Sequence, residues 1–164
     1  MSKSKPASTP QSQSLETLGK FRIIVRAAQR HSAAIQKQCG VSGAQLWLLQ
    51  EIAEAPGLRV GELAARMAIH QTTASNLIDA LEKRGYLKKS RDDADQRVVN
   101  LLLTPSGNKL LRKAPSPARG LLPEALAKVD PKKRAQLDAG LQALLDVIED
   151  ADSAAGRQLL PFNM

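Results

Sequence analysis

Residues 60–103, VGELAARMAIHQTTASNLIDALEKRGYLKKSRDDADQRVVNLLL, contain the pattern that decides the fold. Two short stretches, residues 60–67 and 71–84, place apolar residues at intervals of three and four, which is typical of amphipathic helices. Only three residues separate them, and two short helices joined by so tight a turn form a helix-turn-helix. Ala64 and Ala74 are small at the positions where two crossing helices approach closely.

After Gly85 the pattern changes to that of β-strands. Residues 86–90 lead into a polar turn, residues 91–96, and the β-branched and apolar stretch 98–103 follows. Two such stretches around a polar turn predict a β-hairpin. A helix-turn-helix followed by a hairpin is a winged helix, so we expect a mainly helical protein with a small β wing.

Helices are also predicted on the N-terminal side of the winged helix. Residues 1–14 have little apolar surface and predict a disordered basic tail. Residues 15–38 then carry one apolar stripe, which Gly40 ends. Ser42 can cap a further helix that stops at Pro56.

On the C-terminal side, Thr104 can cap a helix that begins with a proline. Pro115 and Pro117 cannot lie inside an unbroken helix, so they predict a break, which we interpret as a hinge. Asp130 can cap a last helix, and the chain after it is predicted to fray. The expected regions are a winged helix at 41–104, a helical dimerisation region at 15–40 and 105–150, and a C-terminal tail at 151–164.

Composition limits the class of function. The chain has 164 residues, a net charge of +8 and only 2% aromatic residues. A basic excess fits nucleic acid or another anionic partner, whereas so few aromatic rings argue against a stacking platform for single strands or sugars. No apolar run approaches the ~18 residues of a membrane span, and no secretory signal is seen. We therefore expect a cytoplasmic protein without a membrane contact.

Enzymatic activity is not indicated. The chain has two histidines and one cysteine, and it lacks a glycine-rich phosphate loop, an HExxH metal spacing and a GxSxG nucleophile turn. We expect no catalytic residues, metal or cofactor. A helical module that binds another protein is the alternative from a different class. It would explain the helices and the charge, but not a hairpin that carries Asp95 and Arg97 in register.

One set of residues in the winged helix resembles the MarR family of bacterial transcription regulators. The set is Leu81-Glu82-Lys83-Arg84-Gly85, nine residues, Asp95-Gln96-Arg97, five residues, Leu103-Thr104 and then Gly107. It is similar to the family pattern LExxG…DxR…LTxxG, and the resemblance covers about residues 15–148. It implies a homodimer whose first and last helices interlock. It also implies two winged lobes that bind a palindromic operator in double-stranded DNA, most often to repress a promoter.

The second helix of a helix-turn-helix enters the major groove, where its first residues reach base edges. The residues predicted to face outward there are polar: Gln71, Thr72, Thr73, Ser75 and Asn76. Glutamine and asparagine can bond adenine, while serine and threonine can bond phosphate or base. The family often has arginine where this chain has Asn76, which favours adenine over guanine. The same residues would also suit the solvated face of any surface helix.

Arg97, at the tip of the predicted wing, is the strongest single candidate for DNA contact. By resemblance it reaches into the minor groove, whose negative potential is concentrated where A·T pairs narrow it. Asp95 can pair with it and orient it, although a surface pair without a DNA role is the alternative. Nearby basic residues suit phosphate contacts, which add affinity without sequence choice: Lys83, Arg84, Lys88, Lys89 and Arg91.

The resemblance further implies a pocket for a small aromatic or anionic effector between the helical region and the winged lobe. The candidates are Arg26, Arg30, His31, Trp47 and Arg112. Arginine suits a carboxylate and Trp47 could stack on a ring, but Trp47 is equally interpreted as a core residue.

Cys39 allows a second hypothesis, because some relatives sense peroxide through one cysteine. It lies at the end of the first helix, where Lys37 would favour the thiolate slightly. A structural thiol is the alternative. His70, at the start of the second helix of the helix-turn-helix, occupies a position where the family prefers a serine or aspartate cap.

Overall fold

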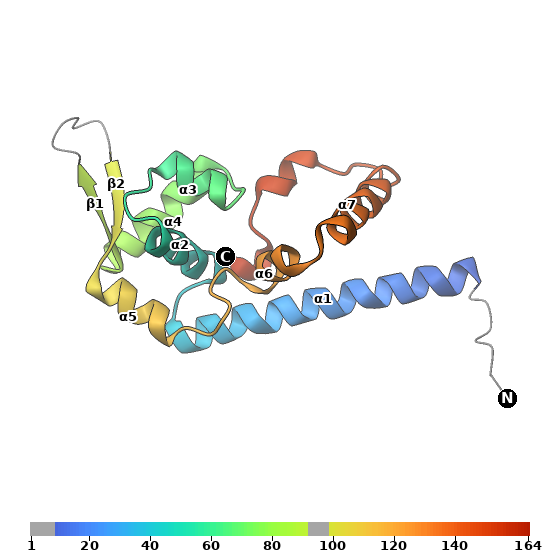
Figure 1. Ribbon diagram of the computed structural model, residues 1–164, viewed down its shortest axis with the longest axis horizontal. Helices are drawn as coiled ribbons and strands as arrows, with labels where there is room; N and C mark the ends of the chain where they lie inside the picture. Colours follow the sequence, from blue (N-terminus) through green and yellow to red (C-terminus); the bar gives the residue numbers. More distant parts are fainter. Residues whose placement is uncertain (1–8, 92–98) are drawn as a thin grey trace.

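The computed structural model describes residues 9–91 and 99–164 and is mainly helical with one small sheet (Figure 1). Helix α1, Pro10–Cys39, runs along one long side of the molecule. A lobe at its end holds α2 (Gly43–Glu54), α3 (Val60–Arg66), α4 (Gln71–Lys83), β1 (Leu87–Arg91) and β2 (Val99–Leu103). Then follow α5 (Pro105–Lys113), α6 (Leu121–Lys128), α7 (Pro131–Leu145) and the 3₁₀ helices η1 (Ser153–Arg157) and η2 (Pro161–Asn163). The predicted fold class is confirmed.

The helix-turn-helix packs through the residues that the sequence pattern selects. Ala64 of α3 and Ala74 of α4 are both buried, which lets the two helices approach closely. Ile78 and Leu81 of α4 are fully buried beside Leu101 of β2 in the same hydrophobic core. The apolar face of α4 therefore points inward and leaves its polar face outside.

The sheet is an antiparallel pair in which Leu87 lies opposite Leu103 and Arg91 opposite Val99. Backbone bonds also join β2 to the segment before α3. The Gly57 amide donates to the Leu101 carbonyl, and the Leu101 amide donates to the Leu58 carbonyl, both at 3.0 Å. The wing is thus tied to the lobe at its base.

Three residues of the LExxG and LTxxG pattern meet where α4, β1 and α5 join. Gly85 has φ +74°, a left-handed conformation that glycine adopts most readily. The Thr104 hydroxyl donates to the Gly85 carbonyl at 2.6 Å and accepts the Gly107 amide at 3.1 Å. A Cβ atom on Gly107 would lie only 2.0 Å from the Tyr86 carbonyl oxygen. Close backbone packing therefore requires glycine at position 107 and holds the two parts of the pattern together.

The predicted helix ends largely agree with the structure. Gly40 ends α1 with φ +66°, and Ser42 forms a reciprocal capping box with Gln45 at the start of α2. Thr104 and Asp130 cap α5 and α7, each followed by proline. The interruption between α5 and α6 contains Pro115 and Pro117, as predicted.

Both ends of the chain differ from the prediction. Helix α1 begins at Pro10 rather than near residue 15, because the Thr9 hydroxyl caps it by accepting the Ser12 amide at 3.4 Å. Residues 1–8 lie outside the described part of the chain. The prediction of a frayed C-terminus is wrong, since η1 and η2 fold back onto the lobe and Leu159 packs against its core. Helix α7 ends at Leu145, five residues earlier than expected.

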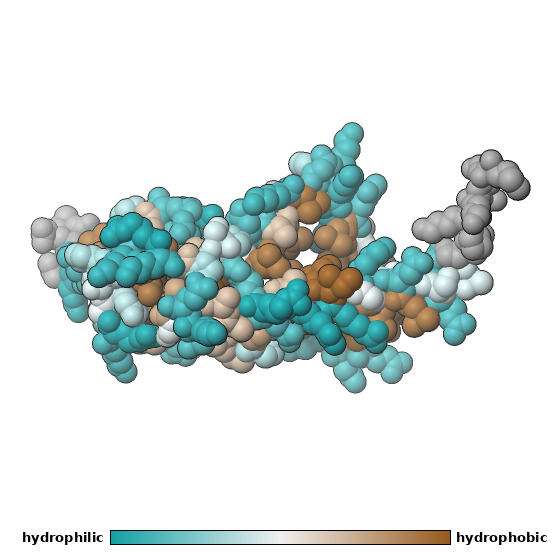
Figure 2. All heavy atoms as spheres, turned by 90° about the horizontal axis from the view of Figure 1, so that it is seen from below, coloured by the Kyte–Doolittle hydropathy of each residue, from teal (hydrophilic) through white to brown (hydrophobic). Residues whose placement is uncertain are grey.

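Two apolar helix faces remain uncovered. Every residue of α7 is exposed, and an apolar row on and just after it is 38–49% exposed: Leu137, Leu141, Leu144, Leu145 and Ile148. The N-terminal half of α1 has a matching set that is 41–68% exposed: Leu15, Leu18, Ile23, Ile24 and Val25. Figure 2 shows apolar atoms gathered on the side of the molecule that holds these two helices.

Candidate nucleic-acid interface

Helix α4 presents a polar surface at its start. Gln71, Thr72 and Asn76 are exposed, whereas Thr73 and Ser75 are half-buried at the edges of the same face. Beneath them the buried apolar side chains of α4 anchor the helix to the lobe. The arrangement can present amide and hydroxyl groups to the edges of bases.

The turn before α4 is tight and carries backbone strain. Ala68 has φ +52°, which a residue with a side chain seldom adopts. His70 is the N-cap residue, but its side chain makes no capping hydrogen bond. Its amide instead donates to the Arg157 carbonyl at 3.3 Å, so the C-terminal segment contacts this turn.

Lys89 of β1 fixes the base of the wing to α4. Its Nζ lies 2.6 Å from Asp79 Oδ1 and 2.9 Å from Glu82 Oε2, and its amide donates to Glu82 Oε1 at 3.2 Å. Hydrogen bonding to Lys89 lowers the pKa of Asp79, and hydrogen bonding to Asp79 and then Glu82 raises the pKa of Lys89. Two carboxylates therefore already balance its charge, which weakens Lys89 as a phosphate contact.

The other predicted phosphate contacts lie around the same junction. Lys83 and Lys88 are exposed, and Arg91 ends β1. Arg84 donates from Nη1 to the Gly40 carbonyl at 2.8 Å and lies 5.1 Å from the centre of the Tyr86 ring. Its guanidinium thus also holds the end of α1 against the lobe. Asp95 and Arg97 lie outside the described residues, so their roles stay predictions.

The five effector candidates are spread over three helices. Arg26 and Arg30 are exposed on α1, and Arg112 is exposed on α5. His31 is half-buried, with Nε2 2.9 Å from the Pro117 carbonyl oxygen, which ties α1 to the segment between α5 and α6. Trp47 packs against the core. None of the five lines either of the grooves described next, and the effector pocket stays a prediction.

Two open grooves flank the lobe. One, of about 450 Å³, lies between the end of α1, the start of α2, α4 and the C-terminal segment; Thr73, Asn76, Leu159 and Met164 are among its walls. The other, of about 290 Å³, lies along the α5–α6 connection beside Gln50 and Arg119.

In the part of the chain that the structure describes, no three histidine, cysteine or acidic side chains lie close enough together to hold a metal ion.

Cys39 is half-buried and packs against the core. Burial raises the pKa of its thiol, contrary to our expectation that Lys37 would favour the thiolate. A thiol with a raised pKa is a poorer nucleophile at neutral pH, which favours a structural role.

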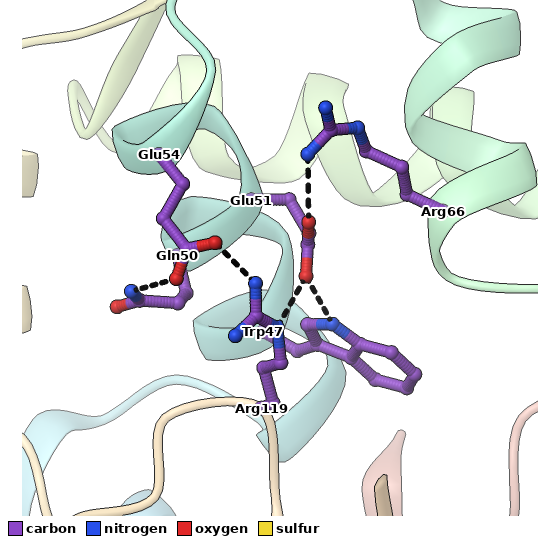
Figure 3. A network of polar contacts seen from close by, with 6 residues as sticks. All are labelled: Trp47, Gln50, Glu51, Glu54, Arg66 and Arg119. Atoms are coloured by element: carbon purple, nitrogen blue, oxygen red, sulfur yellow. Dashed lines mark hydrogen bonds and ion pairs between the residues drawn. The ribbon is translucent and has the colours of Figure 1, made fainter. Parts of the chain in front are cut away.

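A buried carboxylate that the sequence pattern did not reveal links the lobe to the α5–α6 connection (Figure 3). The side chain of Glu51 on α2 is only 6% exposed. It accepts from Trp47 Nε1 at 2.9 Å, from Arg119 Nε at 2.7 Å and from Arg66 Nη1 at 3.4 Å. The donors come from α2, the α5–α6 connection and α3, so one carboxylate joins three parts of the fold.

Glu54 extends this network. It accepts from Gln50 Nε2 at 2.8 Å and also bonds Arg119 Nη2. The hydrogen bond from Gln50, with a further contribution from Arg119, lowers the pKa of Glu54. The bond to Glu51 raises the pKa of Arg119.

The sequence held one sign of the contact between Trp47 and Glu51. Glu51 follows Trp47 by four residues on a largely apolar helix, and side chains at that spacing meet on the same helix face.

Comparison with known proteins finds relatives by sequence and a likeness of fold by structure. Residues 40–98 match a family model described as MarR family. The chain is 31% identical over 96 residues to the uncharacterised HTH-type transcriptional regulator YsmB of Bacillus subtilis, and 26% identical over 102 residues to the transcriptional repressor MprA of Escherichia coli. These alignments cover 54% and 62% of this chain, and 66% and 58% of the relatives.

Among solved structures, the chain resembles Sco3205, a MarR family transcriptional regulator of Streptomyces coelicolor that was crystallised with DNA. The TM-score is 0.58 at 20% identity, over 92% of this chain and 96% of the other. At that identity the likeness is one of fold. Over the described residues, no helix is long and apolar enough to cross a membrane.

Proposed function

Since the chain belongs to the MarR family, we propose that it binds double-stranded DNA in a sequence-specific way and regulates transcription in the cytoplasm. The relatives with a stated role are transcription regulators, which favours this function over an enzyme. Repression is the expected direction, because MprA is a transcriptional repressor.

The polar face of α4 is the feature that most favours DNA binding. Gln71, Thr72 and Asn76 are exposed at the start of a helix that buried residues hold rigidly from behind. In a helix-turn-helix this is the part that reaches base edges. The wing base is bound to the same helix through Lys89, so helix and wing would approach DNA as one unit.

We further propose that the chain acts as a homodimer through the uncovered faces of α1 and α7. A 15-residue helix that contacts solvent on all sides is marginally stable by itself, so α7 needs a partner. Large exposed apolar patches mark association sites. A second copy supplies the matching faces by symmetry, and the two α4 helices would then read half-sites about 10 base pairs apart on one face of the duplex.

A small effector would release DNA by binding better to one spacing of the two lobes than to the other. The five effector candidates, Arg26, Arg30, His31, Trp47 and Arg112, stay predictions for the lining of its pocket. Neither a peroxide sensor at Cys39 nor a protein-binding module gains support from the comparisons.

Selection of genomic fragments by the purified chain tests the proposal. We expect recovery of a few fragments that share an inverted repeat, bound by a dimer in sedimentation analysis. The matched control is the chain with Gln71→Ala and Asn76→Ala, which should lose the enrichment while staying dimeric. Random recovery by the unaltered chain would contradict sequence-specific binding.

A further inference from the structure

We propose that the C-terminal segment, residues 153–164, is a positioning element that holds the start of α4 in place for reading DNA. This inference rests on the proposed DNA-binding function and adds a part to it. The segment follows α7 and returns to the lobe, with its end against α1 and α2 (Figure 1). It contacts α1, α2 and the turn before α4, and so joins three elements.

Ser32 of α1 and Gly43 of α2 form the place where the end of the segment docks. Ser32 is buried on the apolar face of α1, and its hydroxyl donates to the Phe162 carbonyl. A buried hydroxyl without a partner is costly, so this bond explains a polar residue in an apolar stripe. Gly43, the first residue of α2, leaves space for the segment. A Cβ atom there would lie 3.1 Å from Asn163 Oδ1 and 3.1 Å from Ser32 Oγ.

At its other end the segment contacts the strained turn before α4. The Arg157 carbonyl accepts the His70 amide at 3.3 Å. Ala68, two residues earlier, has φ +52°, and such a conformation persists only where its surroundings hold it. The Ala68 and Ile69 amides bond back to the end of α3, and the bond from the His70 amide to Arg157 adds a restraint on this turn from outside the helix-turn-helix. Leu159 fixes the segment between its two ends by packing on the core.

The segment supports α4 rather than covering it. Gln71, Thr72 and Asn76 stay exposed while the segment is docked. Leu159 and Met164 share a groove with the half-buried Thr73 and with one edge of Asn76, so the segment lies along the flank of the helix. Loss of the segment should therefore weaken specific binding, whereas a segment that blocked DNA would strengthen it when removed.

Three substitutions and one shortened chain test the proposal. Ser32→Ala removes the donor to Phe162, and Ser32→Thr retains a hydroxyl. Ser14→Ala is the matched control, because Ser14 is an exposed serine on the same helix whose hydroxyl bonds only its own helix, at the Pro10 carbonyl. A chain that stops at Asp152 removes the whole segment.

Each variant is titrated by fluorescence anisotropy against a duplex recovered from genomic selection and against a scrambled duplex. Amide hydrogen exchange at residues 69–73 and sedimentation are measured alongside. We expect Ser32→Ala to lower the affinity for the specific duplex about fivefold, which corresponds to the net free energy of one hydrogen bond. The same substitution should speed amide exchange at the start of α4. Ser32→Thr should restore both, and Ser14→Ala should change neither. The chain that stops at Asp152 should lose more affinity for the specific duplex than Ser32→Ala does. All variants should bind the scrambled duplex as the unaltered chain does.

Unchanged or tighter binding of the specific duplex by the folded, shortened chain would overturn the proposal. Equal losses on both duplexes would also overturn it, because they would indicate general destabilisation. If the shortened chain does not fold, the comparison of Ser32→Ala with Ser32→Thr decides. An unaltered chain that prefers no duplex would instead refute the proposed function, and the positioning role with it.

Discussion

Glu51→Gln is the substitution whose effect the structure specifies best. Glutamine keeps the shape of the side chain, so its amide oxygen can still accept from Trp47 and Arg119, but it removes the charge and turns an NH2 group toward Arg66. The bond from Arg119 Nε at 2.7 Å loses its charge assistance, which is the largest part of the expected effect, and the bond from Trp47 is weakened next. Arg66 at 3.4 Å contributes least.

The expected loss is smaller than for a fully buried ion pair. The Arg119 side chain is 33% exposed and that of Arg66 is 45% exposed, so both regain hydration when the carboxylate is neutralised. Charge-assisted bonds contribute about 1.5–3 kcal/mol each before this correction. We therefore expect the free energy of unfolding to fall by about 2 kcal/mol, a decrease in Tm of about 4–8 °C for a chain of this size.

Chemical and thermal unfolding followed by circular dichroism measure this change. The control is Glu54→Gln on the same helix, whose side chain is 40% exposed and whose loss should cost about 0–1 kcal/mol. If Glu51→Gln unfolded like the unaltered chain, or if Glu54→Gln cost more, the buried carboxylate would not be the link between α2 and the α5–α6 connection.

Arg97→Ala should weaken specific binding at least about tenfold in an anisotropy titration and leave the dimer folded, because a minor-groove guanidinium would be removed; unchanged affinity would refute the wing contact. Burial raises the pKa of Cys39, so its thiolate should form at higher pH than that of a free cysteine, and alkylation near neutral pH should be correspondingly slow. Fast alkylation would contradict this, and release of DNA by oxidant in Cys39→Ser would exclude a sensor at that site. Leu141→Glu should convert the dimer to monomers in sedimentation, because it places a charge on the uncovered face of α7, whereas Gln136→Glu on the same helix should not. A dimeric Leu141→Glu chain would show that α7 is not the interface.

The winged helix was predictable from the sequence because its signals are local. Apolar periodicity, Gly85 and the caps at Ser42 and Thr104 act within one or two helical turns, as does the cap at Asp130 for α7 outside the winged helix. The spacing between Gly85 and Gly107 reflects a tertiary contact, yet it was recognisable because the junction leaves so little freedom.

Long-range partners were not predictable in the same way. Lys89 is assigned from the sequence to phosphate, but folding places it between Asp79 and Glu82. Arg119, more than sixty residues from Glu51, gives no sign of its partner in the sequence. The C-terminal residues have weak helical patterns, and their contacts with Ser32, the His70 amide and the core lie far away in the sequence. The hinge at Pro115 and Pro117 stays a prediction.

The most direct test of duplex reading by α4 is one titration series over salt concentration. The purified chain is titrated with a duplex from genomic selection and with the same bases in scrambled order. We predict that affinity for both falls as salt rises, because phosphate contacts release counterions. The selected duplex should still bind at least about 1,000-fold more tightly near physiological salt. Equal affinity for the two duplexes at every salt concentration would contradict sequence recognition by this chain.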